Sequence, residues 1–162
     1  MIDTTVESKN PVHQLLEGSA LRDAYRLSFL ANHLTGPVYA GIERDCGLTR
    51  PEYLTLLCLH HRDGLAAKDI SLLAGYPKNS ISRAVHLLRD KGLINRRPHP
   101  TDGRRATLHI TATGADLCAT TIDRFLSQQS RLLQILSAAE RRQLDALLTK
   151  LIEASPDWID PY

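Results

Sequence analysis

The side chains best suited to binding a charged partner are concentrated in residues 78–105. This segment holds eight lysines and arginines and two acidic residues, so it carries a net charge of +6, whereas the rest of the chain carries −4. A basic segment on an otherwise acidic body is typical of proteins that bind a polyanion such as DNA or RNA. From charge alone, a solvated surface with a chance cluster of basic residues remains the alternative.

Side chains that can contact DNA lie at the start of a helix predicted over residues 77–91. A helix fits the major groove of DNA, and its N-terminal residues reach the base edges. Lysine and arginine can bind guanine or phosphate, asparagine can pair with adenine, and serine can bond to phosphate oxygens. The candidate residues are Lys78, Asn79, Ser80, Ser82 and Arg83. Ile81, Val85 and Leu88, at steps of four and three, form the apolar stripe that we expect to hold this helix on the core.

A basic hairpin is predicted directly after this helix. Residues 93–97 and 106–110 have the composition of strands, and the prolines and the Asp-Gly pair between them indicate a hairpin loop. An arginine that projects from the loop can enter the narrow minor groove. The candidate DNA-binding residues of the hairpin are Arg97, Arg104 and Arg105. Asp102 favours the turn, and its carboxylate can also hold the Arg104 guanidinium in one orientation.

The rest of the pattern supplies the elements that must position these residues. A short helix over residues 66–74, then Gly75, then the helix that begins near Pro77 form the order of a helix-turn-helix. A longer helix is predicted from about residue 19 to residue 46, and we expect Gly36-Pro37 to kink it or break it in two.

Capping residues predict where three further helices start. Thr49 with Glu52 and Ser137 with Glu140 form capping boxes, and Thr111 can cap the long helix between them. The helix after Thr111 repeats apolar residues at near-heptad spacing, and the last helix carries five leucine or isoleucine residues on one side. These stripes predict a homodimer, with a monomer that covers them internally as the alternative.

The expected fold is mainly α-helical with a small β-hairpin wing, that is, a winged helix-turn-helix joined to a helical dimerisation region from the N- and C-terminal helices. We divide the chain into an N-terminal arm and dimerisation helix over residues 1–48, a DNA-binding region over residues 49–111, and C-terminal dimerisation helices with a tail over residues 112–162.

Several short motifs resemble the multiple antibiotic resistance regulator (MarR) family over roughly residues 20–153. The motifs that carry the resemblance are Lys68-Asp69-Ile70, Gly75, Ser80-Ile81-Ser82-Arg83, Lys91-Gly92-Leu93-Ile94 and Asp102-Gly103-Arg104-Arg105. The resemblance implies a homodimer that binds a pseudo-palindromic DNA operator. It also implies a transcriptional regulator, in many members a repressor, that releases DNA when a small molecule binds.

The resemblance further implies a small organic effector, often an aromatic acid or a phenol, bound between the first, second and fifth helices. The candidate effector-binding residues are His33, Tyr39, Tyr53 and His60. Two alternatives concern the signal. Cys46, Cys58 or Cys118 could sense redox state, and the seven histidines could sense a metal, although the chain has no His-x3-His pair and no Cys-x2-Cys.

Enzyme signatures are absent from the sequence. It has no phosphate-cradling glycine loop, no nucleophile elbow and no distinctive pair of carboxylates, so we predict no catalytic residue, no metal site and no cofactor. It also has no run of about 18 apolar residues, and its scattered cysteines favour a reducing compartment, so we expect a cytoplasmic protein without a membrane partner. A winged-helix protein–protein adaptor is the remaining alternative, but an adaptor need not keep a basic helix and wing.

Overall fold

The computed structural model describes residue 16, residues 18–98 and residues 106–155. The elements in chain order are the helices α2 (Arg22–Cys46), α3 (Arg50–His61), α4 (Ala67–Ala74) and α5 (Lys78–Asp90), the strands β1 (Ile94–Pro98) and β2 (Ala106–Ile110), and the helices α6 (Ala112–Leu133) and α7 (Ala138–Glu153). The fold is therefore mainly helical with one antiparallel hairpin, as the sequence predicts.

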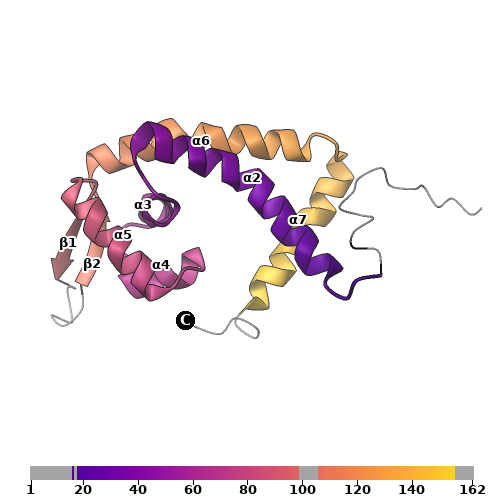
Figure 1. The fold of residues 1–162 in the computed structure, drawn as a ribbon, viewed down its shortest axis with the longest axis horizontal. Helices are drawn as coiled ribbons and strands as arrows, with labels where there is room; N and C mark the ends of the chain where they lie inside the picture. The colour runs from indigo at the N-terminus through magenta and orange to yellow at the C-terminus, as the bar shows by residue number, and fades with distance from the viewer. Residues whose placement is uncertain (1–15, 17, 99–105, 156–162) are drawn as a thin grey trace, which may run out of the picture.

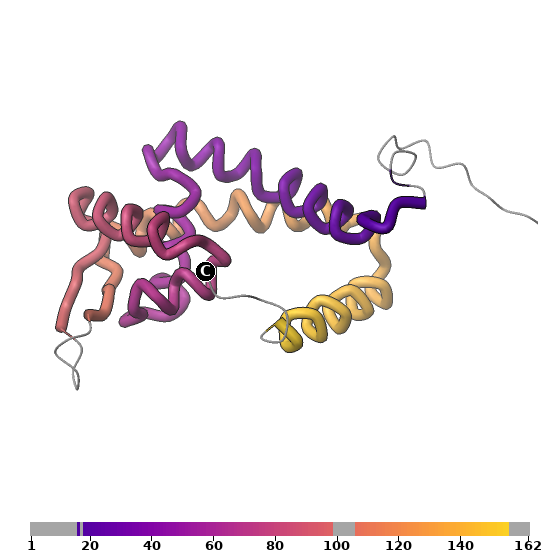
Figure 2. Tube along the Cα trace, turned by 60° about the horizontal axis from the view of Figure 1, so that its bottom comes forward, coloured from indigo at the N-terminus to yellow at the C-terminus, as the bar shows by residue number. Residues whose placement is uncertain are grey.

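The helices and the hairpin separate into a compact unit and a long extension (Figure 1). Helices α3, α4 and α5 gather with the hairpin at one end, and the long helices α2 and α6 run side by side away from them. Figure 2 shows α7 at the far end of this pair, apart from the compact unit. The two long helices thus connect the helix-turn-helix to a helical region that makes little contact with it.

The core lies where α3 is surrounded by α2, α4, α5 and α6. Tyr53, Leu56 and Leu59 of α3 are fully buried there, together with Ile81 and Leu88 of α5. The predicted stripe of α5 is therefore confirmed at two of its three positions. At the third position Val85 is only half-buried, because it faces the gap between α5 and the hairpin, while Ala84 is buried instead.

Helix α2 continues through Pro37 without a break. Proline removes one backbone donor, and the helix on either side keeps its own hydrogen bonds, so the predicted break does not occur. The second half of α2 buries Val38 and Ile42 in the core, but Leu27 and Leu30 in its first half are 55% and 46% exposed. Helix α7 buries no residue in the single chain. The extension therefore presents apolar side chains that the single chain does not cover.

Local signals fix the helix starts as predicted. The Thr111 hydroxyl accepts a hydrogen bond from the Gly114 amide, and the Ser137 hydroxyl accepts one from the Glu140 amide. Gly114 must be glycine, because a Cβ there would lie 2.4 Å from the Leu93 carbonyl oxygen. This close approach sets the start of α6 against the residues that lead from α5 into β1.

A buried carboxylate joins α2, α3 and α5 at their common junction. The Glu52 carboxylate accepts hydrogen bonds from the Thr49 amide and hydroxyl at 2.8 and 2.7 Å, and from the ammonium of Lys91. Lys91 also donates to the carbonyl oxygen of Gly47, which ends α2, at 2.8 Å. Burial raises the pKa of Glu52, but the hydrogen bonds from Lys91 and Thr49 outweigh burial and the pKa lies below its usual value. Lys91 thus neutralises the buried Glu52 carboxylate and joins it to the end of α2.

Replacing the lysine of this junction tests its contribution to stability. We expect Lys91→Met to lower the free energy of unfolding by about 2 kcal/mol at pH 7, because the buried Glu52 carboxylate loses its cation but keeps the Thr49 hydrogen bonds. Since the pKa of Glu52 is lowered on folding, its stabilising effect is complete above the usual value of 4.5 and is lost as the pH falls below it. The difference between variant and wild type should therefore shrink toward pH 3. Denaturant unfolding at fixed protein concentration measures both effects, with Arg89→Met, an exposed cation on the same helix, as the control. Equal losses for the two variants would contradict this role.

Candidate nucleic-acid interface

The outer face of α5 carries polar and charged side chains in one stripe. Asn79, Ser82, Arg83 and His86 lie at steps of three, one and three residues, all are exposed, and together they line an open groove of about 510 Å³. Lys78 is exposed at the start of the helix, and Ser80 is half-buried. Four of the five residues predicted on this helix are therefore free to meet a partner.

The turn before α5 is fixed by local hydrogen bonds. Gly75 ends α4 with a φ of 63°, a left-handed conformation that glycine adopts without strain. The buried Ser71 hydroxyl donates to the Tyr76 carbonyl oxygen at 2.6 Å, and the Asp69 carboxylate accepts from the Ala66 amide at 3.2 Å. Gly75 and the Ser71 bond set the angle between α4 and α5 and so fix which face of α5 points outward, whereas the Asp69 bond caps the start of α4.

The hairpin is attached to the helix-turn-helix by its second strand. Strands β1 and β2 pair antiparallel, with Arg96 opposite Leu108 and Arg97 opposite Thr107. The Leu108 amide donates to the Leu65 carbonyl oxygen at 2.9 Å, and its carbonyl accepts from the Gly64 amide at 3.0 Å. The segment between α3 and α4 thus acts as a short third strand beside β2.

A side-chain tie reinforces this attachment. Asp63 accepts from His109 Nδ1 at 2.7 Å with one carboxylate oxygen and from the Ile110 amide at 2.8 Å with the other. His109 Nε2 lies 3.0 Å from the Thr107 hydroxyl in the same strand. Burial raises the pKa of Asp63, but the hydrogen bonds from His109, Ile110 and Gly64 outweigh it and lower that pKa. The ionised Asp63 therefore holds β2 to the end of α3.

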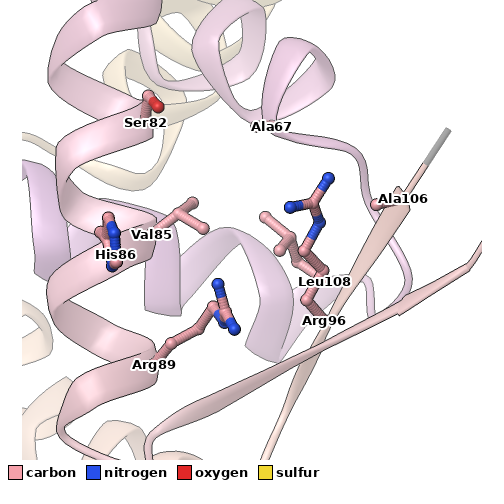
Figure 3. Close-up of a pocket in the computed structure, with 8 residues that line it drawn as sticks. All are labelled: Ala67, Ser82, Val85, His86, Arg89, Arg96, Ala106 and Leu108. Atoms are coloured by element: carbon pink, nitrogen blue, oxygen red, sulfur yellow. The ribbon is translucent and has the colours of Figure 1, made fainter. Parts of the chain in front are cut away.

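The two arginines of β1 lie on different faces of the hairpin, because neighbouring residues of a strand point to opposite sides. Arg97 is exposed beside Thr107, whose hydroxyl contacts the Arg97 carbonyl oxygen at 3.5 Å. Arg96 points into the space between the hairpin and α5, where Arg89 meets it from the helix (Figure 3). The remaining hairpin predictions, Asp102, Arg104 and Arg105, fall outside the described residues.

Sequence reasoning did not name three residues that the structure brings to this region. His86 and Arg89 follow Ser82 by four and seven residues, which places Ser82, His86 and Arg89 on one side of α5, facing β1. This spacing can be read from the sequence and could have identified His86 and Arg89 as residues of the site. The position of Arg96 opposite them depends on how the hairpin docks, and no local pattern reports that.

The four predicted effector residues are divided among three places. Tyr39 and Tyr53 lie together, with ring centres 6.2 Å apart, and both contact Phe125 of α6. The buried Tyr53 hydroxyl lies 2.9 Å from the Thr121 hydroxyl. His33 stacks on Phe29 and lines a separate cavity of about 330 Å³ between α2 and α6. His60 is exposed at the end of α3 beside His61.

The positions of the described cysteines and histidines bear on the two alternative signals, a metal and redox state. No group of three or more histidines, cysteines or acidic residues there is placed to hold a metal ion. Burial raises the pKa of Cys58, and raises that of Cys118 to about 11, which keeps both thiols protonated at neutral pH.

Among the residues that the structure describes, no helix combines the length and apolar character that a bilayer crossing requires.

Comparison with known proteins points to one family. Residues 47–105 match the model of the MarR family. The putative transcriptional regulatory protein for the hcr operon of Thauera aromatica is 33% identical over 105 residues, which are 65% of this chain and 63% of that protein. The match thus spans less than two thirds of that relative.

Solved structures show the same fold over most of this chain. Staphylococcus aureus MepR, solved in complex with DNA, aligns with a TM-score of 0.69 and 25% identity over 81% of this chain and 96% of MepR. The PcaV regulator of Streptomyces coelicolor, solved with its natural ligand, aligns with a TM-score of 0.66 and 24% identity over 86% of this chain and 96% of PcaV.

The tie between Asp63 and His109 can be tested by hydrogen exchange. Asp63→Asn removes the charge, and we expect the Ile110 and Leu108 amides to exchange faster by a factor on the order of ten, because β2 opens more readily from the end of α3. The midpoint of global unfolding should change little, since Asp63 is half exposed. Asp116→Asn, at an exposed position on α6, is the control. Unchanged exchange at both amides would show that the carboxylate does not hold the strand.

Proposed function

We propose that this chain, whose residues 47–105 match the model of the MarR family, is a transcriptional regulator of that family that binds a double-stranded DNA operator as a homodimer. The observation that supports this most strongly is the division of α5 into two faces. Ile81 and Leu88 are fully buried, while Asn79, Ser82 and Arg83 are exposed along one groove. A helix anchored in this way can enter the major groove with its polar side chains toward the base edges.

The proposed contacts follow from the position of each element. Lys78, Asn79, Ser82 and Arg83 meet base edges and phosphates in the major groove, and Ser80 bonds to a phosphate near the start of α5. The hairpin contributes Arg97, Arg104 and Arg105 toward the adjacent minor groove, with Asp102 orienting Arg104. The tie from Asp63 to His109 keeps the hairpin in place for this contact.

The homodimer is supported by apolar side chains that the single chain leaves uncovered. Leu147, Leu151 and Ile152 of α7 are each more than half exposed, as is Leu27 of α2. A second copy can cover these faces through residues 1–48 and 112–162, which leaves residues 49–111 free to bind DNA. A two-fold axis would place the two α5 helices about 34 Å apart on successive turns of a pseudo-palindromic site.

We further propose that the protein represses transcription and that binding of a small aromatic acid or phenol relieves this repression. Repression requires only that the bound dimer occupies DNA that the transcription machinery needs. The cavity between α2 and α6 supports the effector, because its volume of about 330 Å³ suits a small ring compound. Phe29 and His33 offer stacking surfaces there, and Arg131 offers a cation for a carboxylate. Tyr39 lies further along α2, where its ring contacts Tyr53 of α3 and Phe125 of α6.

Alanine substitutions on α5 and in the hairpin test the DNA-binding function. On duplexes selected by the purified protein, we expect Arg83→Ala and Arg104→Ala each to weaken binding by roughly ten- to a hundredfold, with the far-UV circular dichroism and the sedimentation of a dimer unchanged. Wild-type affinity should fall steeply as salt rises, since bound phosphates release counterions. Arg142→Ala, at an exposed position on α7, serves as the control. A wild-type protein that selects no duplex, or that sediments as a monomer at micromolar concentration, would contradict the proposal.

Titration with aromatic acids tests the effector. We expect a binding compound to raise the melting temperature of the free protein and to lower its affinity for DNA, because it favours a state that binds DNA less well. Arg131→Gln should weaken the response to the acid and leave the response to the matching neutral amide unchanged. A panel of aromatic acids and phenols with no effect on either quantity would remove this part of the proposal.

A further inference from the structure

A basic hollow lies between α5 and the hairpin. Its volume is about 320 Å³, and its apolar lining is formed by Ala67, Val85, Ala106 and Leu108. Four polar side chains surround it: Ser82, His86 and Arg89 from α5 and Arg96 from β1. Figure 3 shows the Arg89 and Arg96 guanidinium groups turned into the same space from the two elements.

Among the residues that the structure describes, the two arginines of the hollow have no acidic partner. Asp90, the nearest acidic residue in sequence, lies 3.8 Å from His86 Nδ1. Over residues 18–98 and 106–155, no carboxylate lies within 4.0 Å of Arg89 or Arg96. Two guanidinium groups that face one space repel each other, so this arrangement favours an anion between them. Arginine binds phosphate through paired N–H donors, and the Ser82 hydroxyl adds another donor.

The position of the hollow identifies the anion. The sugar-phosphate backbone is the ridge that separates the major groove from the minor groove. If α5 enters the major groove and the hairpin enters the adjacent minor groove, the strand between the two grooves must cross the gap between α5 and β1. That gap is the hollow that Arg89 and Arg96 flank.

We infer that Arg89 and Arg96 together clamp one backbone phosphate of the DNA between the helix and the hairpin, with Ser82 as a third donor. This inference rests on the proposed DNA-binding function and adds a specific site to it. The clamp fixes the distance between the two grooves that the protein contacts, because a helix residue and a hairpin residue hold the same phosphate. It carries no base specificity, since a phosphate is present at every step of the duplex.

Salt dependence distinguishes one shared phosphate from two separate ones. Arg89→Gln and Arg96→Gln should each weaken binding to a selected duplex by roughly tenfold. The dimer holds two clamps, so in a plot of log affinity against log salt concentration each single variant should reduce the slope by at most about 1.8, and the double variant should reduce it by about 1.8 as well. A double variant whose slope falls by about twice as much would show two independent phosphates and overturn the clamp. Arg142→Gln on α7 is the matched control.

Chemical change of single phosphates then locates the contact. A neutral methylphosphonate is placed in turn at each position of the duplex. At the position between the two contacted grooves, we expect wild-type binding to weaken about tenfold and the double variant to weaken less than twofold. Equal weakening of both proteins at every position would overturn the inference. If wild type binds no duplex, the proposed function itself fails, whereas tight binding that neither arginine affects removes only the clamp.

Inorganic phosphate tests whether the hollow binds a free anion instead. If the clamp is built for DNA, adding millimolar inorganic phosphate at constant ionic strength should raise the melting temperature of the wild type and of the double variant by less than about one degree each. A large increase in the wild type alone, without any loss of DNA affinity in the double variant, would assign the hollow to a free anion.

Discussion

Helix α5 must be held firmly on one side while its other side stays free, and this constraint organises the rest of the structure. Ile81 and Leu88 bury one side of α5 completely against α3 and its neighbours. The step of three to four residues then sends Ser82, Arg83 and His86 outward. Helix α3 is the common support, because it also packs against α2 and α6. Any displacement of α5 relative to α3 would therefore turn the outward residues away from a partner.

Electrostatics in this protein serve two separate purposes, although the basic residues lie close together in the sequence. Lys91 neutralises the buried Glu52 and joins the ends of α2 and α5 to the start of α3. Arg89, only two residues earlier, faces Arg96 across a solvent-exposed hollow. The count of +6 over residues 78–105 thus includes a lysine that stabilises the fold. The cations available to DNA are those without an acidic neighbour, and only the three-dimensional arrangement identifies them.

Sequence patterns predicted the elements that depend on near neighbours. The caps at Thr111 and Ser137, the stop at Gly75 and the two strands all follow from interactions within a few residues. The outward residues of α5 were predicted for the same reason. Contacts between distant segments were not predicted: Asp63 with His109, Glu52 with Lys91, and Arg89 with Arg96 depend on how the elements dock. Of the two outcomes expected at Pro37, a kink or a break, the break does not occur, because the surrounding turns of α2 offset one lost hydrogen bond.

The central claim is that the exposed basic face running from α5 to the hairpin is the surface that contacts DNA. Labelling of arginines with a glyoxal reagent, followed by mass spectrometry, tests it directly when free protein is compared with protein bound to a selected duplex. The account predicts that Arg83, Arg89 and Arg96 lose reactivity in the complex while Arg142 on α7 keeps it. Protection of Arg142 with continued labelling of the other three would contradict the account, because DNA would then lie on the opposite end of the molecule.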